Sequence, residues 1–354
     1  MASTFDGTMP VREPHRIDPG AVEQWMRQHV PGYAGPLSIE QFKGGQSNPT
    51  YCLRTPGRSY VLRRKPPGVQ IKGAHAVERE ARVMAALGQA GFPVPRVLGL
   101  CTDEAVIGSW FFVMEMVQGR IFWDAGFPDQ APGERGAYAD AMNETLAALH
   151  RIDPAQAGLA DYGKREPYVA RQVARWSRQY LDDGLAGRHP AMDRLIEWLP
   201  EHLPGTEEVA IIHGDFRVDN MIFHPTAPRV IAVLDWELST LGNPLADFAY
   251  HAMMYRMPPD ILGGIAGRAA EGMPGEADYV RAYCERTGRA GIADLDFYIA
   301  FNMFRFAAIL HGIRGRALRG TAASADAVAM GERYGRVADL AWAQALRVGR
   351  EETT

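Results

Sequence analysis

The periodicity of hydrophobic positions changes about a third of the way along the chain. Up to about residue 117, short β-prone runs bounded by glycine or proline predominate. These runs cover residues 37–39, 50–53, 59–62, 94–100 and 109–117. From residue 119 onward, apolar residues recur mainly at helical spacing. The pattern therefore predicts a small antiparallel sheet followed by a mainly helical region.

Two helices are expected within the sheet region. Asp18 followed by Pro19 is a helix-start signal, and apolar positions from Val22 onward continue at helical spacing. A second helix is predicted from about residue 76 to 87. Between the first two strands, residues 43–49 predict a flexible turn rich in glycine.

One β-rich insert interrupts the later helices. Helical spacing covers residues 133–150, 168–181, 192–203, 278–287, 294–318 and 325–346. The insert spans residues 209–237 and contains apolar runs at 210–212, 221–223 and 230–234. The sequence thus predicts an α+β chain with an N-terminal lobe of residues 1–117 and a C-terminal lobe of residues 118–354. A ligand site is expected in the cleft between such lobes.

Composition and charge exclude several classes of function. Among 354 residues, 38 are Lys or Arg and 42 are Asp or Glu, so the net charge of −4 gives no reason to expect nucleic acid as a partner. The 3 cysteines are widely spaced, which fits a reducing compartment. The N-terminal residues carry no apolar signal region, so we expect a cytoplasmic protein. The most apolar stretch, residues 298–313, is interrupted by Arg305 and His311 and is shorter than the roughly 20 residues of a membrane span.

The densest cluster of chemically capable residues lies in the insert. Asp215 and Asn220 are five residues apart between two apolar runs, and Asp235 follows the next run. Carboxylate and amide oxygens are hard ligands that suit Mg²⁺. The spacing matches the protein-kinase arrangement, in which an aspartate meets the substrate hydroxyl while an asparagine and a second aspartate hold the metal.

These motifs resemble a known family. His213-Gly214-Asp215-x4-Asn220, together with Leu234-Asp235-Trp236-Glu237, is similar to the catalytic core of the aminoglycoside/choline kinase-like phosphotransferases. Residues 77–80 resemble the family's small-lobe helix and residues 112–119 its hinge strand. Residues 62–68 and 75–80 are similar to a sub-branch that includes kinase-like domains fused to acyl-CoA dehydrogenases. The resemblance covers nearly the whole chain and implies a two-lobed protein-kinase-like fold.

The resemblance also implies roles for the residues that match the motifs. Asp215 would orient the acceptor hydroxyl, and Arg217 would stabilise charge on the phosphoryl group in transit. Asn220 and Asp235 would bind Mg²⁺ between the phosphates of ATP, and Glu237 would help a second metal ion.

Further positions would hold the nucleotide. The turn that contains Ser47 would cover the phosphates, and the main chain of Glu115 and Val117 would bind adenine. Arg63 stands where the family pattern has a lysine paired with Glu80, and Lys65 is the alternative phosphate ligand.

The acceptor is expected to be a small molecule, and its class is suggested by charge. Residues 297–325 contain no acidic residue. The basic residues there are Arg305, His311, Arg314, Arg316 and Arg319. A basic lining favours an anionic acceptor, such as a hydroxy acid or its CoA thioester, over a polycationic aminoglycoside. The alternative is that these are solvated or salt-bridged surface residues.

Other interpretations remain open at this stage. Arginine at position 63 also fits a nucleotide-binding pseudokinase, and the family includes aminoglycoside-type antibiotic kinases. A metal-dependent phosphohydrolase would use His213, Asp215, His224 and Asp235. We expect His213 to be structural, and Asp247 to cap a helix or brace the active-site loop.

Overall fold

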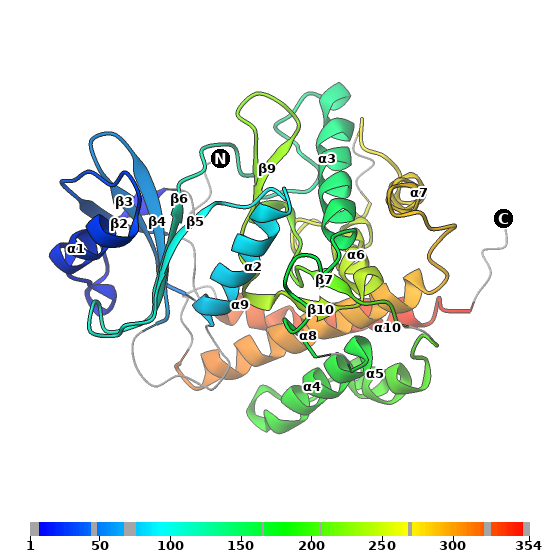
Figure 1. The fold of residues 1–354 in the computed structure, drawn as a ribbon. Coiled ribbons are helices and arrows are strands. Elements are labelled where there is room, and N and C mark those ends of the chain that lie inside the picture. Colours follow the sequence, from blue (N-terminus) through cyan, green and yellow to red (C-terminus); the bar gives the residue numbers. More distant parts are fainter. Residues whose placement is uncertain are drawn as a thin grey trace. The chain divides into compact units, whose positions relative to one another are not determined.

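A computed structural model describes residues 7–43, 48–66, 76–164, 166–205, 207–267, 271–321 and 327–349. The chain divides into two compact units (Figure 1). The first unit comprises residues 1–123, 157–159 and 219–239. The second comprises residues 124–156, 160–218 and 240–354.

The first unit is built on an antiparallel sheet in the order β1-β2-β3-β4-β6-β5. Its strands are β1 (Thr8–Met9), β2 (Ser38–Phe42), β3 (Thr50–Arg54), β4 (Ser59–Arg64), β5 (Val97–Cys101) and β6 (Phe111–Glu115). Helix α1 (Pro19–His29) buries Val22, Trp25 and Met26 in a core shared with alternate residues of the strands.

Side-chain alternation places Arg63. Leu62 of β4 belongs to the core beneath α1. Because successive side chains of a strand point to opposite faces, Arg63 projects from the other face. Helix α2 (Val77–Gln89) packs against β5 and β6 and supplies Glu80 as the partner of Arg63.

A short hairpin completes the first unit. Strands β8 (Met221–Phe223) and β9 (Val230–Val233) pair antiparallel, with Met221 opposite Val233. The hairpin joins the first unit because the Val233 amide donates to the Pro93 carbonyl (2.9 Å) and the Trp236 ring packs edge-on against Phe92. The sequence pattern assigned these residues to the later lobe. The lobe boundary at residue 117 stays a prediction. The compact units are not continuous in sequence, because these long-range contacts add residues 219–239 to the first unit.

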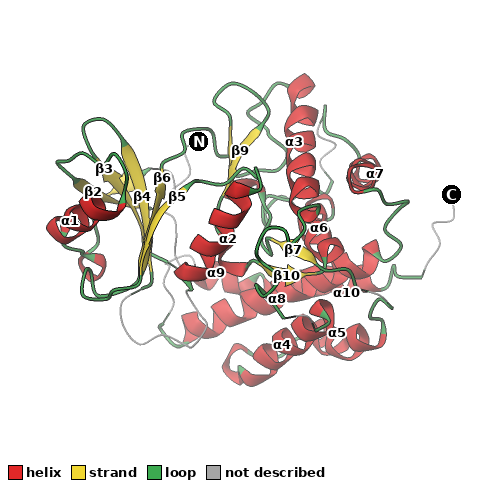
Figure 2. Ribbon diagram, in the orientation of Figure 1, coloured by secondary structure: helices red, strands yellow, loops and turns green. Residues whose placement is uncertain are grey.

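The second unit is mainly helical (Figure 2). Its helices are α3 (Pro132–His150), α4 (Tyr168–Asp182), α5 (Pro190–Glu201), α6 (Pro244–Ala252), α7 (Glu276–Thr287), α8 (Leu295–Leu318), α9 (Ala327–Glu332) and α10 (Tyr334–Ala345). Helix α8 is central, since α4, α6, α9 and α10 all pack on it. Strand β7 (Ala210–Ile212) pairs antiparallel with β10 (Thr240–Gly242).

Short 3₁₀ turns complete the described elements. They are Glu13–His15, Gly184–Ala186, Val218–Asn220, Trp236–Leu238 and Met253–Tyr255. Across the described part of the chain, no helix combines the length and the apolar character needed to cross a bilayer.

The fold confirms the α+β class, with an antiparallel sheet in the N-terminal part and helices in the C-terminal part. The helix expected at residues 325–346 is helical from residue 327 to 345, divided at Arg333 into α9, which ends at Glu332, and α10, which begins at Tyr334. Gly331, a poor helix former, is buried where a Cβ atom would lie only 2.7 Å from the Arg314 backbone on α8. Helix α6 was not predicted, although Asn243 followed by Pro244 signals its start and the Asn243 side chain caps it.

Candidate active site

In the first unit, the Arg63 guanidinium lies among three carboxylates. Its Nε is 2.8 Å from Glu80 Oε2, and its Nη2 is 2.6 Å from Asp235 Oδ1. The same Nη2 is 3.4 Å from Glu237 Oε2. Arg63 is only 8% exposed. A buried guanidinium needs such partners, because a charge removed from water without compensation is costly.

Glu80 is the most deeply buried of these carboxylates. Its Oε1 accepts from Asn48 Nδ2 (2.9 Å), and the same amide group donates to Glu237 (3.3 Å). Burial, reinforced by Asp235 and Glu237, raises the pKa of Glu80 to about 7, although Arg63 acts in the opposite direction. The three carboxylates outnumber the guanidinium, so this cluster attracts further positive charge.

The β8–β9 hairpin brings Asn220 and Asp235 to one end. The Leu234 amide donates to the Asn220 carbonyl (2.8 Å), just beyond the paired residues Met221 and Val233. Asp235 then adopts a left-handed backbone conformation, with φ of 63°. Such a conformation is uncommon for a residue with a side chain and marks functional sites.

The oxygen donors at this end fit Mg²⁺. Among the described residues, no group of three or more His, Cys, Asp or Glu side chains is arranged to enclose a metal ion. Magnesium does not require such a cage, because it binds one or two protein oxygens and completes its shell with water and phosphate. Asn220, Asp235 and Glu237 supply oxygens of the required type.

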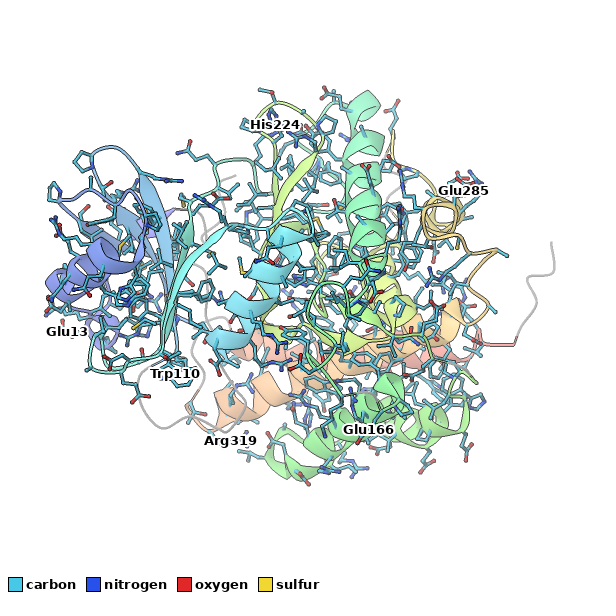
Figure 3. All side chains as sticks on the ribbon, in the orientation of Figure 1. Glu13, Trp110, Glu166, His224, Glu285 and Arg319 are labelled. Carbon is cyan, nitrogen blue, oxygen red and sulfur yellow. The ribbon has the colours of Figure 1, made fainter. Side chains whose placement is uncertain are left out.

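The structure distinguishes between the two candidate basic residues. Lys65 lies beyond the end of β4, where its Nζ is 2.9 Å from Glu78 Oε2 and 4.0 Å from the centre of the Trp110 ring. Arg63, not Lys65, therefore pairs with Glu80, while Lys65 lies over the ring of Trp110, which is labelled in Figure 3. Ser47 and the rest of residues 44–47 lie outside the described residues.

The predicted hinge is the end of strand β6. The Glu115 amide donates to the Arg96 carbonyl (3.0 Å), and the Glu115 side chain accepts from the Arg96 amide (3.1 Å). The Glu115 amide is thus engaged within the sheet, and its main-chain contribution to an adenine ring would be the carbonyl. Val117 follows two residues later, outside the strand.

In the second unit, Asp215 has two polar partners. Its Oδ1 accepts a hydrogen bond from the Tyr250 hydroxyl (2.5 Å) and lies 3.4 Å from Arg217 Nε. Burial alone would raise the pKa of Asp215. Arg217, the Tyr250 hydrogen bond and the nearby His213 and Arg305 outweigh it and hold that pKa below its usual value. Asp215 is therefore an ionised acceptor at neutral pH.

The loop that carries Asp215 is fixed from two sides. The Asp247 carboxylate on α6 accepts from the amides of His213 (2.8 Å) and Gly214 (2.9 Å). From α8, Arg305 Nη2 donates to the Gly214 carbonyl (2.7 Å). Gly214 has a φ of 81°, a conformation open to glycine without strain. Of the two roles expected for Asp247, the structure shows the brace, and Asn243 is the cap.

His213 and His224 have local structural contacts. His213 is fully buried, and its Nδ1 accepts from the Asp215 amide (3.2 Å). His224, labelled in Figure 3, lies just after β8, and its Nδ1 accepts from the amides of Thr226 (3.3 Å) and Ala227 (3.2 Å). These contacts suit structural histidines. They give no support to a phosphohydrolase metal centre.

A narrow apolar pocket adjoins the partners of Asp215. Its free volume is about 30 Å³, and its lining includes Arg217 and Tyr250. The remaining lining is apolar except for His251: Ala125, Phe216, Val218, His251, Met253, Met254, Met257 and Leu262. Methionine side chains adapt their shape to what they contact, so this pocket can enlarge around an apolar group.

The basic residues of the C-terminal part do not all line one surface. Arg305 is buried beneath the Asp215 loop, with its guanidinium 5.2 Å from the centre of the Tyr250 ring. His311 is buried and contacts the Gly187 carbonyl (2.8 Å). Arg314 lies over the Tyr334 ring, and Arg319 pairs with Asp183. Arg305 and His311 thus make buried contacts within the fold, whereas Arg316 and Arg319 line a common surface groove. A basic lining of the acceptor site stays a prediction.

Sequence reasoning missed Tyr250. Nothing in the motif around Asp215 points to a tyrosine 35 residues later, and it was hidden within an apolar helix. Its hydroxyl was the available signal, since a buried phenol needs a hydrogen-bond partner.

The comparison with family models decides the classification. Residues 38–298 match the model of the Phosphotransferase enzyme family. The chain belongs to this family. The matched segment includes Arg63, Asp215, Asp235 and Tyr250.

Curated relatives of this family member are much longer than the chain. The chain is 44% identical over 347 residues to acyl-CoA dehydrogenase family member 10 of Mus musculus, covering 97% of this chain and 32% of that protein. It is 46% identical over 329 residues to acyl-CoA dehydrogenase family member 11 of Gallus gallus, covering 90% of this chain and 42% of that protein. The chain thus spans well under half the length of these relatives.

Solved structures of the family share the fold. A candidate aminoglycoside phosphotransferase from Ralstonia eutropha JMP134 superposes with a TM-score of 0.85 and is 50% identical, with 95% of this chain and all of that chain covered. An aminoglycoside phosphotransferase in a ternary complex with ADP and hygromycin B has a TM-score of 0.58 at 15% identity, with 90% of this chain and 98% of that chain covered. The second likeness shows the fold alone.

Proposed function

We propose that this chain is an ATP- and Mg²⁺-dependent kinase that transfers the γ-phosphoryl group to a hydroxyl of a small molecule. The observation that carries the proposal is Asp215, a carboxylate kept ionised by Arg217 and Tyr250 on a loop braced by Asp247. Membership in the phosphotransferase family supports the same reaction class.

Asp215 would accept a hydrogen bond from the acceptor hydroxyl and aim its oxygen at the γ-phosphorus. Phosphoryl transfer passes through a loose transition state, so orientation contributes more than the strength of the base. A low pKa therefore suits this role. Arg217, beside Asp215, would stabilise negative charge on the phosphoryl group in transit.

The first unit would hold the nucleotide. Arg63, fixed by Glu80, would contact the phosphates, and the Glu115 carbonyl with the Val117 main chain would contact adenine. Asn220 and Asp235 would hold Mg²⁺, with Glu237 nearby for a second ion. When bound, the metal neutralises charge on the phosphates. The relative crystallised with ADP supports nucleotide use by this fold.

The acceptor that we favour is a hydroxy acid or hydroxyacyl-CoA. An apolar, methionine-lined pocket beside Arg217 and Tyr250 suits a hydrocarbon segment better than a polycationic aminoglycoside. Relatives named as acyl-CoA dehydrogenases support an acyl substrate.

The decisive experiment measures ATP consumption against a panel of hydroxy acids, their CoA thioesters and aminoglycosides. We expect turnover with at least one acyl compound, its loss on chelation of Mg²⁺, and its loss in D215N with ATP binding retained. Nucleotide binding without turnover of any acceptor would instead support a pseudokinase. Equal turnover by D215N would overturn the role of Asp215.

A further inference from the structure

A surface groove between α4 and α8 concentrates positive charge within the second unit. Its volume is about 490 Å³, far larger than that of the apolar pocket beside Tyr250. Arg175 and Arg178 line it from α4, and Arg316 and Arg319 from α8. Two aspartates, Asp182 and Asp183, also line it, so the arginines outnumber the carboxylates by two to one.

Most of these arginines have no acidic partner. Arg319 forms a two-pronged pair with Asp183, at 2.8 and 2.7 Å. Arg175 stacks over the Trp176 ring at 5.0 Å. Across the described part of the chain, no carboxylate lies within ion-pair distance of Arg175, Arg178 or Arg316. Three guanidinium groups therefore line the groove with no carboxylate of the described residues at ion-pair distance.

The geometry of the groove depends on two glycines within α8. A Cβ atom at Gly312 would lie 2.9 Å from the Gln179 amide, and one at Gly315 would overlap the Asp183 carboxylate. Glycine inside a helix costs about 1 kcal/mol relative to alanine. Here it allows the end of α4 to approach α8 closely, so that arginines from both helices face the same groove.

The groove lies on the same face of α8 as the contact with the Asp215 loop. Arg305, Gly312 and Arg319 are seven residues apart, and Arg316 is four residues after Gly312, so all lie on one helical stripe. At 1.5 Å per residue, Arg316 is roughly 16 Å along the axis from Arg305, which bonds Gly214. Helix α4 follows this stripe in the same direction: Tyr168 interacts with Arg305, and Asp183 pairs with Arg319. Figure 1 shows α4 beside α8, and Figure 3 labels Arg319 at the far end.

We propose that this groove binds phosphate groups at the end of the acceptor that is remote from its reacting hydroxyl. A planar guanidinium group binds two phosphate oxygens at once. The three arginines without an ion pair outnumber Asp182, the carboxylate of the groove that is not paired with Arg319. The groove lies roughly 16 Å along α8 from Arg305, so an extended acceptor with its hydroxyl at Asp215 would place its phosphates there. The identification of this ligand as the acceptor rests on the proposed kinase function, and the anion site itself does not.

The test measures binding of free coenzyme A and of inorganic pyrophosphate to the full chain by titration calorimetry, without ATP. The R178Q/R316Q double variant should bind both probes at least roughly tenfold more weakly, because it loses two charge-assisted contacts. The matched control is R194Q. Arg194 lies on α5, is also exposed, and stacks on the ring of Trp342. All three proteins should have the same thermal unfolding midpoint.

The source of the phosphate is then distinguished by kinetics. If the groove holds the acceptor, pyrophosphate should raise the KM for a hydroxyacyl-CoA and leave the KM for the free hydroxy acid unchanged. Three outcomes would overturn the proposal that the groove binds phosphate groups. They are absence of probe binding, equal binding by the double variant and wild type, and equal weakening in R194Q. If the probes bind in the groove but no acceptor is turned over, the proposed kinase function would be wrong, while the anion site in the groove would be supported.

Discussion

The Tyr250 hydroxyl donates its hydrogen bond to the same oxygen of Asp215 that lies nearest Arg217. A neutral donor and a cation thus share one carboxylate oxygen in a buried setting. Both favour the ionised form of Asp215, and burial raises the pKa of the Tyr250 phenol, so the proton stays on the tyrosine. Tyr250 is therefore a positioning residue for Asp215 in the proposed reaction.

Replacement of Tyr250 by phenylalanine removes this donor. We expect the pKa of Asp215 to rise, so the acid limb of the kcat profile should move to higher pH and kcat should fall roughly tenfold. The KM for ATP should be unchanged. Y255F is the matched control, since the buried Tyr255 hydroxyl has no hydrogen-bond partner among the described residues. An unshifted pH profile in Y250F would contradict this assignment.

Replacement of Arg63 by methionine leaves Glu80, Asp235 and Glu237 without their shared counter-charge. We expect the free energy of unfolding to fall by about 3 kcal/mol and the affinity for ATP by at least roughly tenfold. Urea unfolding and nucleotide titration measure the two effects. K65M is the control, because Lys65 pairs with Glu78 instead, and its ATP affinity should stay within about twofold of wild type. The opposite ranking would reassign the phosphate contact to Lys65.

Asp247→Ala removes the acceptor of two buried amides, those of His213 and Gly214. The free energy of unfolding should fall by about 2 to 4 kcal/mol, because each orphaned amide loses its compensation. Turnover should fall by more than the loss of folded protein accounts for, because the Asp215 loop is then held by Arg305 and no longer by Asp247. D193N, at an exposed pair with Arg188, should change neither quantity appreciably. Wild-type turnover in D247A would show that Arg305 alone holds the loop.

His251 predicts a dependence of stability on pH. Burial lowers the pKa of His251 to about 4, although the Phe216 carbonyl and Asp247 oppose this. Between pH 6.5 and 4 the unfolded chain binds the proton at His251 and the folded chain does not, so the contribution of His251 to stability falls as pH decreases through this range. The loss is about 3 kcal/mol in total. H251Q should remove this contribution, so the unfolding free energy of wild type should fall relative to that of H251Q between pH 6.5 and 4. A constant difference between the two proteins would contradict the assignment.

Much of the first unit could be predicted from local pattern. Short β-prone runs and the spacing of apolar residues predicted β2 to β6, α1 and α2, and β8 and β9 follow their apolar runs, whereas β1 was not predicted. Alternation along β4 places Arg63 on the face opposite to Leu62. Alternation could not choose between Arg63 and Lys65, because both positions have the same parity. The two positions differ because β4 ends at Arg64, so Arg63 lies within the strand and Lys65 lies beyond it.

The elements that were missed depend on distant partners. Strand β10 is three residues long and gains its hydrogen bonds only from β7, thirty positions earlier. The break between α9 and α10 is at Arg333, two residues after Gly331, which packs on the backbone of α8. Neither feature has a periodic signal of its own, because its stability comes from packing against another element.

The sequence by itself determined the types and the spacing of the residues on which the proposed chemistry depends: one aspartate, an asparagine five residues later and a second aspartate after a strand, with arginine in place of the usual lysine. Those are properties of residue type and spacing, which the chain carries locally. Only the tertiary structure decided which groups surround these side chains. Tyr250, Asp247 and Arg305 reach the Asp215 loop from helices that lie up to 91 residues away. Contacts across such separations arise from packing of whole helices, and burial and charge at a site are set by those contacts.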